Sequence, residues 1–207
     1  MCSAYLGPTC YFSEIIGQEH IVIEAFENYT KQTIRNRCYI LGPNGPQLLN
    51  IPMQKVSGKQ RIKDIKISYA EDWQKLHWKS IQTAYGSSAF FEVLAPELEP
   101  FYFKTHDYLL DLNLELTELM LSWIQEKTKL SKSKSFASID SIENDTRFKF
   151  NTKDFSGFSA KKYMQINARE QSFYPNLSII DLLFNEGPMA WELLHLKSNY
   201  REALFVF

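Results

Sequence analysis

The chain has 207 residues, of which 44% are hydrophobic and 14% aromatic, enough for one domain with a sizeable core. The formal net charge of −1 argues against general electrostatic attraction to nucleic acid or to an anionic membrane surface. Three cysteines without CxxC spacing favour reduced thiols and a cytoplasmic location, and the first ten residues lack the cationic start and apolar stretch of a signal peptide.

Strands are expected mainly in the first seventy residues. Residues 3–7 predict a short buried strand, residues 10–16 one or two helical turns, and residues 20–26 a strand rich in branched side chains. Residues 36–42 and 46–54 flank the sequence PNGP. An Asn-Gly pair between two apolar runs is the strongest local indication of a hairpin, so these two segments are expected to pair.

Residues 61–68 carry three isoleucines among cations, which predicts a strand with one solvated face and a bulge where the alternation breaks. Residues 70–86 have helical periodicity, and the glycine at the end of this stretch is a helix stop signal. The expected stripe on one helical face consists of Trp73, Leu76, His77, Ile81, Ala84 and Tyr85.

Residues 87–103 predict a turn or short helix, and the leucine repeat of residues 107–126 predicts the most regular helix of the chain. Its acidic residues are typical of a soluble helix and not of a membrane span. The Lys- and Ser-rich residues 126–138 then predict an exposed loop. Weak strand patterns follow at residues 146–152 and 163–167.

Residues 177–196 predict two helices, with Gly187 ending the first and Pro188 starting the second. The elements together predict a single domain over residues 1–207 in the α/β class. A mixed sheet built mainly from residues 3–68 would be covered by helices from the middle and C-terminal parts. An α+β arrangement stays open, because the pattern does not fix the strand directions.

Cations gather in residues 29–66, which we call the basic segment. It contains eight cations and one acid, and such segregation in a chain of nearly neutral charge predicts a local positive face. The nine charged residues are Lys31, Arg35, Arg37, Lys55, Lys59, Arg61, Lys63, Lys66 and Asp64.

Two arginines make the basic segment a candidate anion site. On an extended chain Arg35 and Arg37 would point to one face, where two guanidinium forks beside Asn36 fit a diphosphate. Lys31 adds a further cation nearby. The alternative is an ordinary solvated sheet face. The loop over residues 56–61 is also basic, but it lacks the spacing of a phosphate-binding P-loop.

The expected helix over residues 70–86 carries His77, a candidate general base because the ordinary histidine pKa lies near neutrality. Trp73, one turn earlier, is a candidate stacking platform for a ring. For both residues the alternative is ordinary packing. No other histidine stands at metal-ligand spacing, so a bound metal is not expected.

Two further positions have a chemical and a structural interpretation. Ser178 and Asp181 stand three residues apart at an expected helix start, which is the arrangement of a capping box. A site role for Asp181 is the alternative. Cys38 directly follows a cation that would lower its thiol pKa, whereas a buried strand thiol would be inert.

Four long segments resemble the WbqC-like protein family. They are NYTKQTIRNRCYI with the following NG and LLNIPMQ, then IKDIKIS, WQKLHWKSIQTAYGSSAFFE and FYPNLSIIDLLFNEGP. The resemblance covers most of the chain and implies a role in surface-polysaccharide biosynthesis of the O-antigen type. The positions within these segments that we single out are Lys31, Gln32, Arg35, Asn36, Arg37, Trp73, His77, Tyr85, Ser178, Asp181 and Asn185.

The sequence and the resemblance together favour a cytoplasmic enzyme that acts by group transfer on a nucleotide-linked sugar, with no cofactor indicated. The candidate catalytic residues are His77 and Asp181. The candidate substrate-binding residues are Lys31, Gln32, Arg35, Asn36, Arg37, Trp73, Tyr85 and Asn185. One alternative is a non-catalytic protein that docks an acidic partner through the basic segment. A concave basic site would favour the enzyme, and a flat or convex one the docking protein. Single-stranded nucleic acid is the least favoured ligand, because overall positive charge is lacking.

Overall fold

The structure of the chain is a computed structural model. The structure describes residues 1–56, 58–136, 145–150, 158, 160–169 and 172–195. Its α-helices are α1 (Thr9–Ile15), α2 (Trp73–Tyr85), α3 (Phe91–Leu98), α4 (Leu109–Ile124), α5 (Ile179–Glu186) and α6 (Ala190–His195). Its strands are β1 (His20–Ile23), β2 (Arg37–Gly42), β3 (Gly45–Asn50) and β4 (Lys129–Lys132). Short 3₁₀ helices are η1 (Ile62–Asp64), η2 (Glu99–Tyr102) and η4 (Gly187–Met189).

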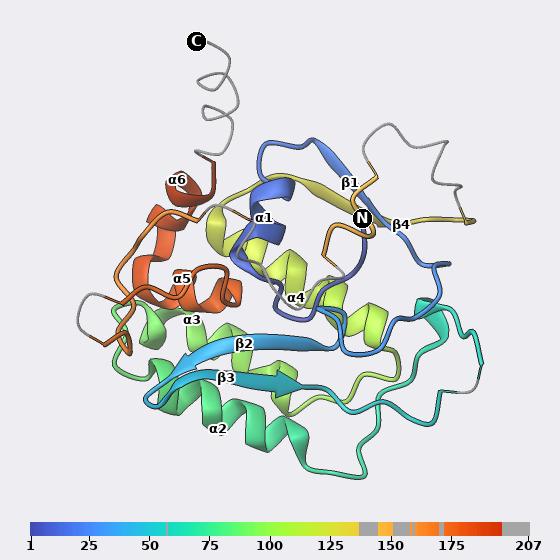
Figure 1. Cartoon of the computed structure of the whole chain (residues 1–207), viewed down its shortest axis with the longest axis horizontal. Helices are drawn as coiled ribbons and strands as arrows, with labels where there is room; N and C mark the ends of the chain where they lie inside the picture. The colour runs from blue at the N-terminus through green and yellow to red at the C-terminus, as the bar shows by residue number, and fades with distance from the viewer. Residues whose placement is uncertain (57, 137–144, 151–157, 159, 170–171, 196–207) are drawn as a thin grey trace.

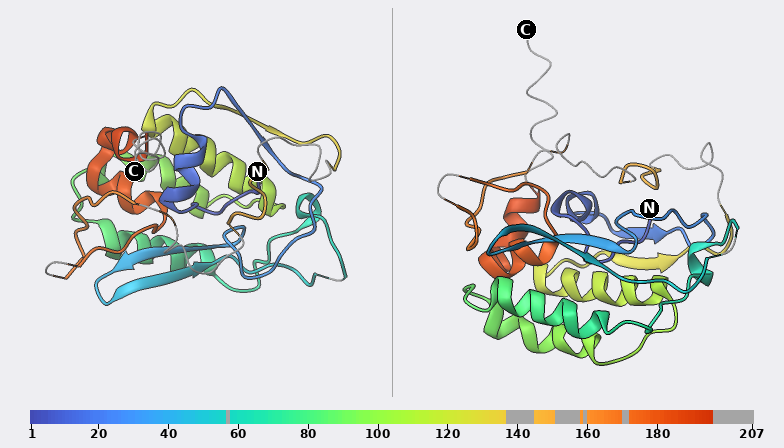
Figure 2. Two further views of the ribbon diagram at one scale, coloured as in Figure 1. Left: turned by 45° about the horizontal axis from the view of Figure 1, so that its top comes forward. Right: turned by 60° about the horizontal axis from the view of Figure 1, so that its bottom comes forward.

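The long helix α4 lies in the middle of the molecule (Figure 1). Its apolar stripe, which includes Leu109, Leu116 and Met120, is fully buried. Two strand pairs lie on different sides of α4, the β1–β4 pair and the β2–β3 hairpin (Figure 2). Helix α2 packs on β2, and α5 packs on α4 and also contacts β2. Among the described residues, no helix combines the length and the apolar character that crossing a bilayer requires.

The strands confirm a mixed α and β fold, but they are arranged in two small sheets. β1 and β4 pair in parallel, from His20 with Lys129 to Ile23 with Lys132. β2 and β3 pair antiparallel, from Arg37 with Asn50 at the open end to Gly42 with Gly45 at the turn.

The hairpin prediction is confirmed. Residues 43 and 44 form the tip, and Gly45 follows with a φ of 113°. A side chain at that φ would be strained, which explains why the Asn-Gly pair closes the turn. Residues 10–16 and 20–26 are also confirmed as the sites of a helix and a strand, and the helices over residues 70–86 and 107–126 correspond to α2 and α4.

Two strands predicted within the first seventy residues are absent. In residues 3–7, Leu6 has a φ of 41°, which interrupts an extended run. In residues 61–68 the chain turns through η1, so Ile62, Ile65 and Ile67 all point into the core. The break in the alternation at residue 64, which predicts a bulge, marks this helical turn instead.

The Lys- and Ser-rich segment was predicted as a loop and instead contains β4, with residues 137–138 outside the described residues. The described part of 146–152 is a turn, with the Lys149 amide donating to the Thr146 carbonyl, and residues 163–167 form no strand. The predicted buried stripe of α2 is wrong at one position, because Leu76 is 63% exposed. Trp78, which the stripe did not include, is buried. Gly187 ends α5 as predicted, with a φ of 54°.

Candidate functional site

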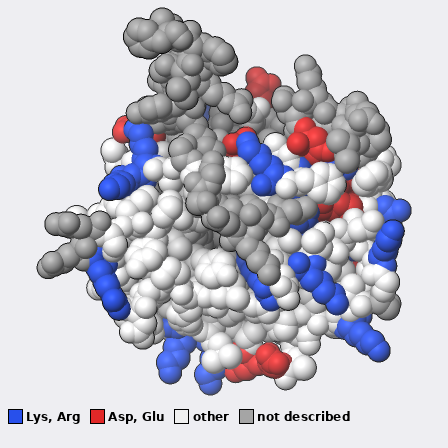
Figure 3. Space-filling model, viewed as in Figure 1, with Lys and Arg blue, Asp and Glu red and all other residues white. Residues whose placement is uncertain are grey.

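The described residues form a hollow of about 500 Å³ at the open end of the hairpin. We call it the hairpin hollow. Its lining residues are Tyr29, Lys31, Gln32, Asn36, Arg37, Asn50, Ile51, Pro52, Met53, Gln54, Lys55 and Val56. Three of these are cations, and none of the described lining residues is acidic. In Figure 3 the area over β2 and β3 holds mainly uncharged side chains, and Lys and Arg side chains lie around it.

Arg37 is held so that one side of its guanidinium group remains available. Its Nε donates to the Asn50 Oδ1 at 2.9 Å, and the same oxygen accepts a hydrogen bond from the Asn36 Nδ2 at 3.1 Å. Within the described part of the chain Arg37 forms no ion pair. A guanidinium anchored through Nε presents its two terminal nitrogens as a fork, which is the geometry that grips a phosphate or carboxylate.

The other polar residues of the hairpin hollow add charge and hydrogen-bonding capacity. Lys31 and Lys55 are exposed and have no carboxylate partner among the described residues. Burial raises the pKa of Tyr29 to about 12, although the charges of Arg37 and Arg35 act in the opposite direction. The Tyr29 hydroxyl is therefore protonated at neutral pH and can donate to an anion.

Asn36 is 6% exposed, and its Oδ1 has no hydrogen-bond partner among the described residues. Its Nδ2 is already used, because it donates to the Asn50 Oδ1 and to the Ile51 carbonyl. The amide orientation is thus fixed by two acceptors, and the remaining oxygen can only accept. Because that oxygen is itself buried, the contribution of Asn36 to the hairpin hollow is to hold the Asn50 side chain that anchors Arg37.

The structure separates the two arginines that the sequence placed on one face. Arg35 is fully buried, and its Nε and Nη2 donate to the two oxygens of Glu27 at 2.8 and 2.7 Å. The reason is that β2 begins at Arg37, whereas Arg35 lies in the preceding turn, where the Asn36 amide donates to the Thr33 carbonyl. Strand alternation therefore does not apply to Arg35, and its charge is neutralised inside the protein.

The rest of the basic segment also divides. The Lys63 Nζ and the Arg61 guanidinium lie over the Phe26 ring, at 4.3 and 5.7 Å from its centroid. The Lys66 Nζ lies 5.7 Å from the centroid of the Tyr108 ring. These cations contact aromatic faces outside the hairpin hollow, and of the eight cations of the basic segment Lys31, Arg37 and Lys55 line it.

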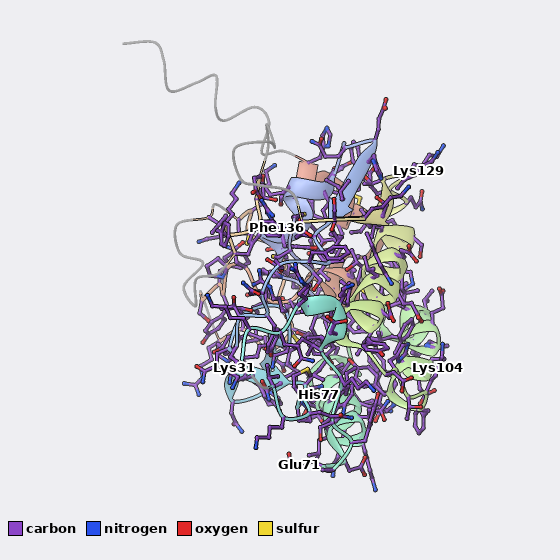
Figure 4. All side chains as sticks on the ribbon, turned by 90° about the vertical axis from the view of Figure 1, so that its right-hand side faces the viewer. Lys31, Glu71, His77, Lys104, Lys129 and Phe136 are labelled. Atoms are coloured by element: carbon purple, nitrogen blue, oxygen red, sulfur yellow. The ribbon has the colours of Figure 1, made fainter. Side chains whose placement is uncertain are left out.

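His77 and Trp73 come together in a buried cluster. The His77 Nδ1 is 2.9 Å from the Tyr5 hydroxyl, and the two rings of His77 and Trp73 meet edge to face at 5.2 Å. Burial lowers the pKa of His77 to about 4, partly offset by a hydrogen bond to the Asn50 backbone. Figure 4 shows Lys31 at the margin of the molecule and His77 further inside. Trp73 is 4% exposed, so its faces are not free for stacking.

A third cluster surrounds the buried carboxylate of Asp181. It accepts hydrogen bonds from the Tyr85 hydroxyl at 2.9 Å, the Tyr163 hydroxyl at 2.6 Å and the Gln165 Nε2 at 2.9 Å. Burial raises the pKa of Asp181, and the three donors act in the opposite direction. The capping box is not formed, because Ser178 donates to the Leu6 carbonyl instead.

The remaining candidates have structural contacts. The Asn185 Nδ2 donates to the Asp181 carbonyl one helical turn earlier. The Cys38 thiol is buried, which raises its pKa and makes the inert alternative the correct one. Of the ten candidates, the hairpin hollow brings together Lys31, Gln32, Asn36 and Arg37. Sequence reasoning missed Asn50, although the hairpin register places it opposite Arg37, and it named Lys55 as part of the basic segment but not as a candidate site residue.

Comparison with known proteins supports one family. The model of the WbqC-like protein family matches residues 3–153. An uncharacterized protein of Mycobacterium tuberculosis is 29% identical over 220 residues, which cover 93% of this chain and 94% of that protein. No solved structure matches the chain.

Proposed function

The chain belongs to the WbqC-like protein family, and from this premise we propose that the hairpin hollow binds the phosphates of a nucleotide-linked sugar. The observation that carries the proposal is the set of three cations, Lys31, Arg37 and Lys55, around one concavity whose described lining contains no acidic residue. The resemblance to proteins of surface-polysaccharide loci supports a role in group transfer from such a sugar during polysaccharide biosynthesis.

Each cation has a defined role in this proposal. Arg37 binds phosphate oxygens with its two terminal nitrogens, because its Nε is occupied by Asn50. Lys31 and Lys55 act as exposed point charges that neutralise a diphosphate. Tyr29 supplies a neutral hydroxyl donor. The hollow is open toward solvent, and the alternative of a surface that docks an acidic protein differs from the proposal in predicting no affinity for a nucleotide-linked sugar.

We assign His77 and Asp181 a positioning role within the same proposal. Neither lines the hairpin hollow, but His77 is hydrogen-bonded to the backbone of Asn50, which anchors Arg37. Asp181 fixes Tyr85, whose hydroxyl in turn accepts from the Leu41 amide of β2. Both clusters therefore hold the hairpin that carries the arginine.

Ligand-induced thermal stabilisation in phosphate-free, low-salt buffer tests the proposal. UDP- and dTDP-linked sugars are compared on wild type, Arg37→Ala and Lys129→Ala, a matched control because Lys129 is an exposed cation on β4, outside the hollow. A ligand at one hundred times its Kd stabilises the wild type by about 2.7 kcal/mol. Arg37→Ala loses a charge-assisted contact of roughly 1.5–3 kcal/mol, so its Kd is expected to rise by at least about tenfold. The Kd of Lys129→Ala is expected to equal that of the wild type. No stabilisation of the wild type, or equal binding by Arg37→Ala, would refute the proposal.

A further inference from the structure

We propose that Tyr39 and Leu48, on the outer face of the hairpin, form the nucleobase subsite of the ligand whose phosphates occupy the hairpin hollow. This inference rests on the proposed function and adds to it the class of ligand: a nucleotide whose base stacks on the hairpin. The two residues, which we call the hairpin platform, belong to none of the candidate sites identified from the sequence.

The register of the hairpin places the platform beside the hollow. Arg37 pairs with Asn50, and two residues further along the strands Tyr39 pairs with Leu48. Side chains two positions apart on a strand share a face, so both pairs point the same way. The opposite face is buried: Ile40 is 0% exposed. Tyr39 and Leu48 are 44% and 40% exposed, which leaves an apolar surface open to solvent.

The spacing fits a nucleotide. Two residues of a strand span about 6.6 Å, roughly the length of a pentose between a phosphate and a base. On β2 the exposed surface ends after Tyr39, whereas on β3 it continues to Pro46, the exposed partner of Leu41. Leu41, the next residue of β2 on this face, is fully buried, and the Asn167 Nδ2 donates to its carbonyl at 2.9 Å. Tyr39 is therefore the exposed aromatic residue of β2 on this face, next to the pair that carries Arg37.

The chemistry of the platform favours a base over other groups. Within the described residues the Tyr39 ring pairs with no other aromatic ring, so its outer face is available. The Tyr39–Leu48 pair offers an aromatic ring beside an aliphatic side chain, and Figure 3 shows mainly uncharged side chains over β2 and β3. Stacking on an aromatic side chain needs only the π-face of a base, whereas a sugar ring would require several polar partners.

Isothermal titration of four nucleoside diphosphates (UDP, dTDP, ADP and GDP) and of inorganic pyrophosphate tests the subsite. The variants are Tyr39→Ala, Tyr39→Phe and Arg37→Ala, with Leu76→Ala as a matched control for loss of an exposed apolar side chain on α2. Base stacking on an aromatic residue corresponds to at least about a fivefold change in Kd. Tyr39→Ala is expected to weaken the tightest nucleotide by that factor or more and to leave pyrophosphate binding unchanged. Tyr39→Phe and Leu76→Ala should bind both as the wild type does.

The results separate the two proposals. One result supports the hollow but refutes the platform: Arg37→Ala lowers the affinity for nucleotide and pyrophosphate, whereas Tyr39→Ala changes neither affinity or lowers both equally. In that case the hollow binds phosphate and the platform is not a base subsite. If wild type binds neither nucleotide nor pyrophosphate, the proposed function and this inference both fail. The melting temperature of each variant identifies misfolding, and Tyr39→Phe tests the ring without removing it.

Discussion

At the scale of single residues, His77 makes stability depend on pH. Burial lowers its pKa to about 4 in the folded chain, against about 6.5 in the unfolded chain. Between pH 6.5 and pH 4 His77 is therefore protonated in the unfolded chain and neutral in the folded chain. Its contribution to the free energy of unfolding is fully present above pH 6.5 and is lost as the pH falls from 6.5 to 4. At about 1.36 kcal/mol per pKa unit, the loss is about 3 kcal/mol.

Urea unfolding of wild type and His77→Gln at pH 4, 5, 6 and 7 measures this effect. Glutamine does not titrate and can still hydrogen-bond the Tyr5 hydroxyl, so the variant is expected to lose about 3 kcal/mol less than the wild type between pH 7 and pH 4. Other groups that titrate in this window contribute equally to both proteins. Parallel pH curves would show that His77 is solvated in the folded state.

At the scale of elements, the turn before β2 depends on a buried ion pair. Arg35 and Glu27 are fully paired with two hydrogen bonds, so removing one partner leaves a buried charge. Arg35→Met is expected to lower the free energy of unfolding by about 3–5 kcal/mol, and Arg35→Met/Glu27→Met by less than the sum of the single changes. Arg37→Met is the matched control, with a small effect on stability and a large one on ligand affinity. Equal destabilisation by both methionine variants would contradict the assignment.

Some elements can be predicted from local sequence patterns, and others cannot. The hairpin, α2 and α4 are marked by local patterns, namely an Asn-Gly turn and helical stripes, and each was predicted within a few residues. β4 was missed because a four-residue strand among lysines forms only through its distant partner β1. Sequence spacing alone cannot distinguish the roles of Arg35 and Arg37. The difference depends on where β2 begins, because Arg37 is its first residue and Arg35 lies outside it.

At the scale of the whole molecule, the first residues tie distant parts of the chain together. The Tyr5 amide donates to the Ile34 carbonyl, and the Tyr5 hydroxyl contacts both His77 and Tyr102. The Glu24 carboxylate, just after β1, accepts from the Arg147 Nη1 at 3.2 Å. The hairpin hollow is thus supported by contacts between segments that no local sequence pattern relates, which explains why its lining was only partly predictable.

The parallel pairing of β1 with β4 has a consequence for how the protein is made. The His20 ring and the Ser131 hydroxyl are 2.8 Å apart in space and 111 residues apart in sequence. During translation the hairpin can close once Asn50 has left the ribosome. β1 stays unpaired until its partner β4, which ends at Lys132, has also been synthesised. In pulse-labelled hydrogen exchange during refolding, hairpin amides should be protected before those of β1. The nascent chain would then carry a formed hairpin together with an unpaired strand edge, so aggregation is expected to be most frequent before residue 132 emerges.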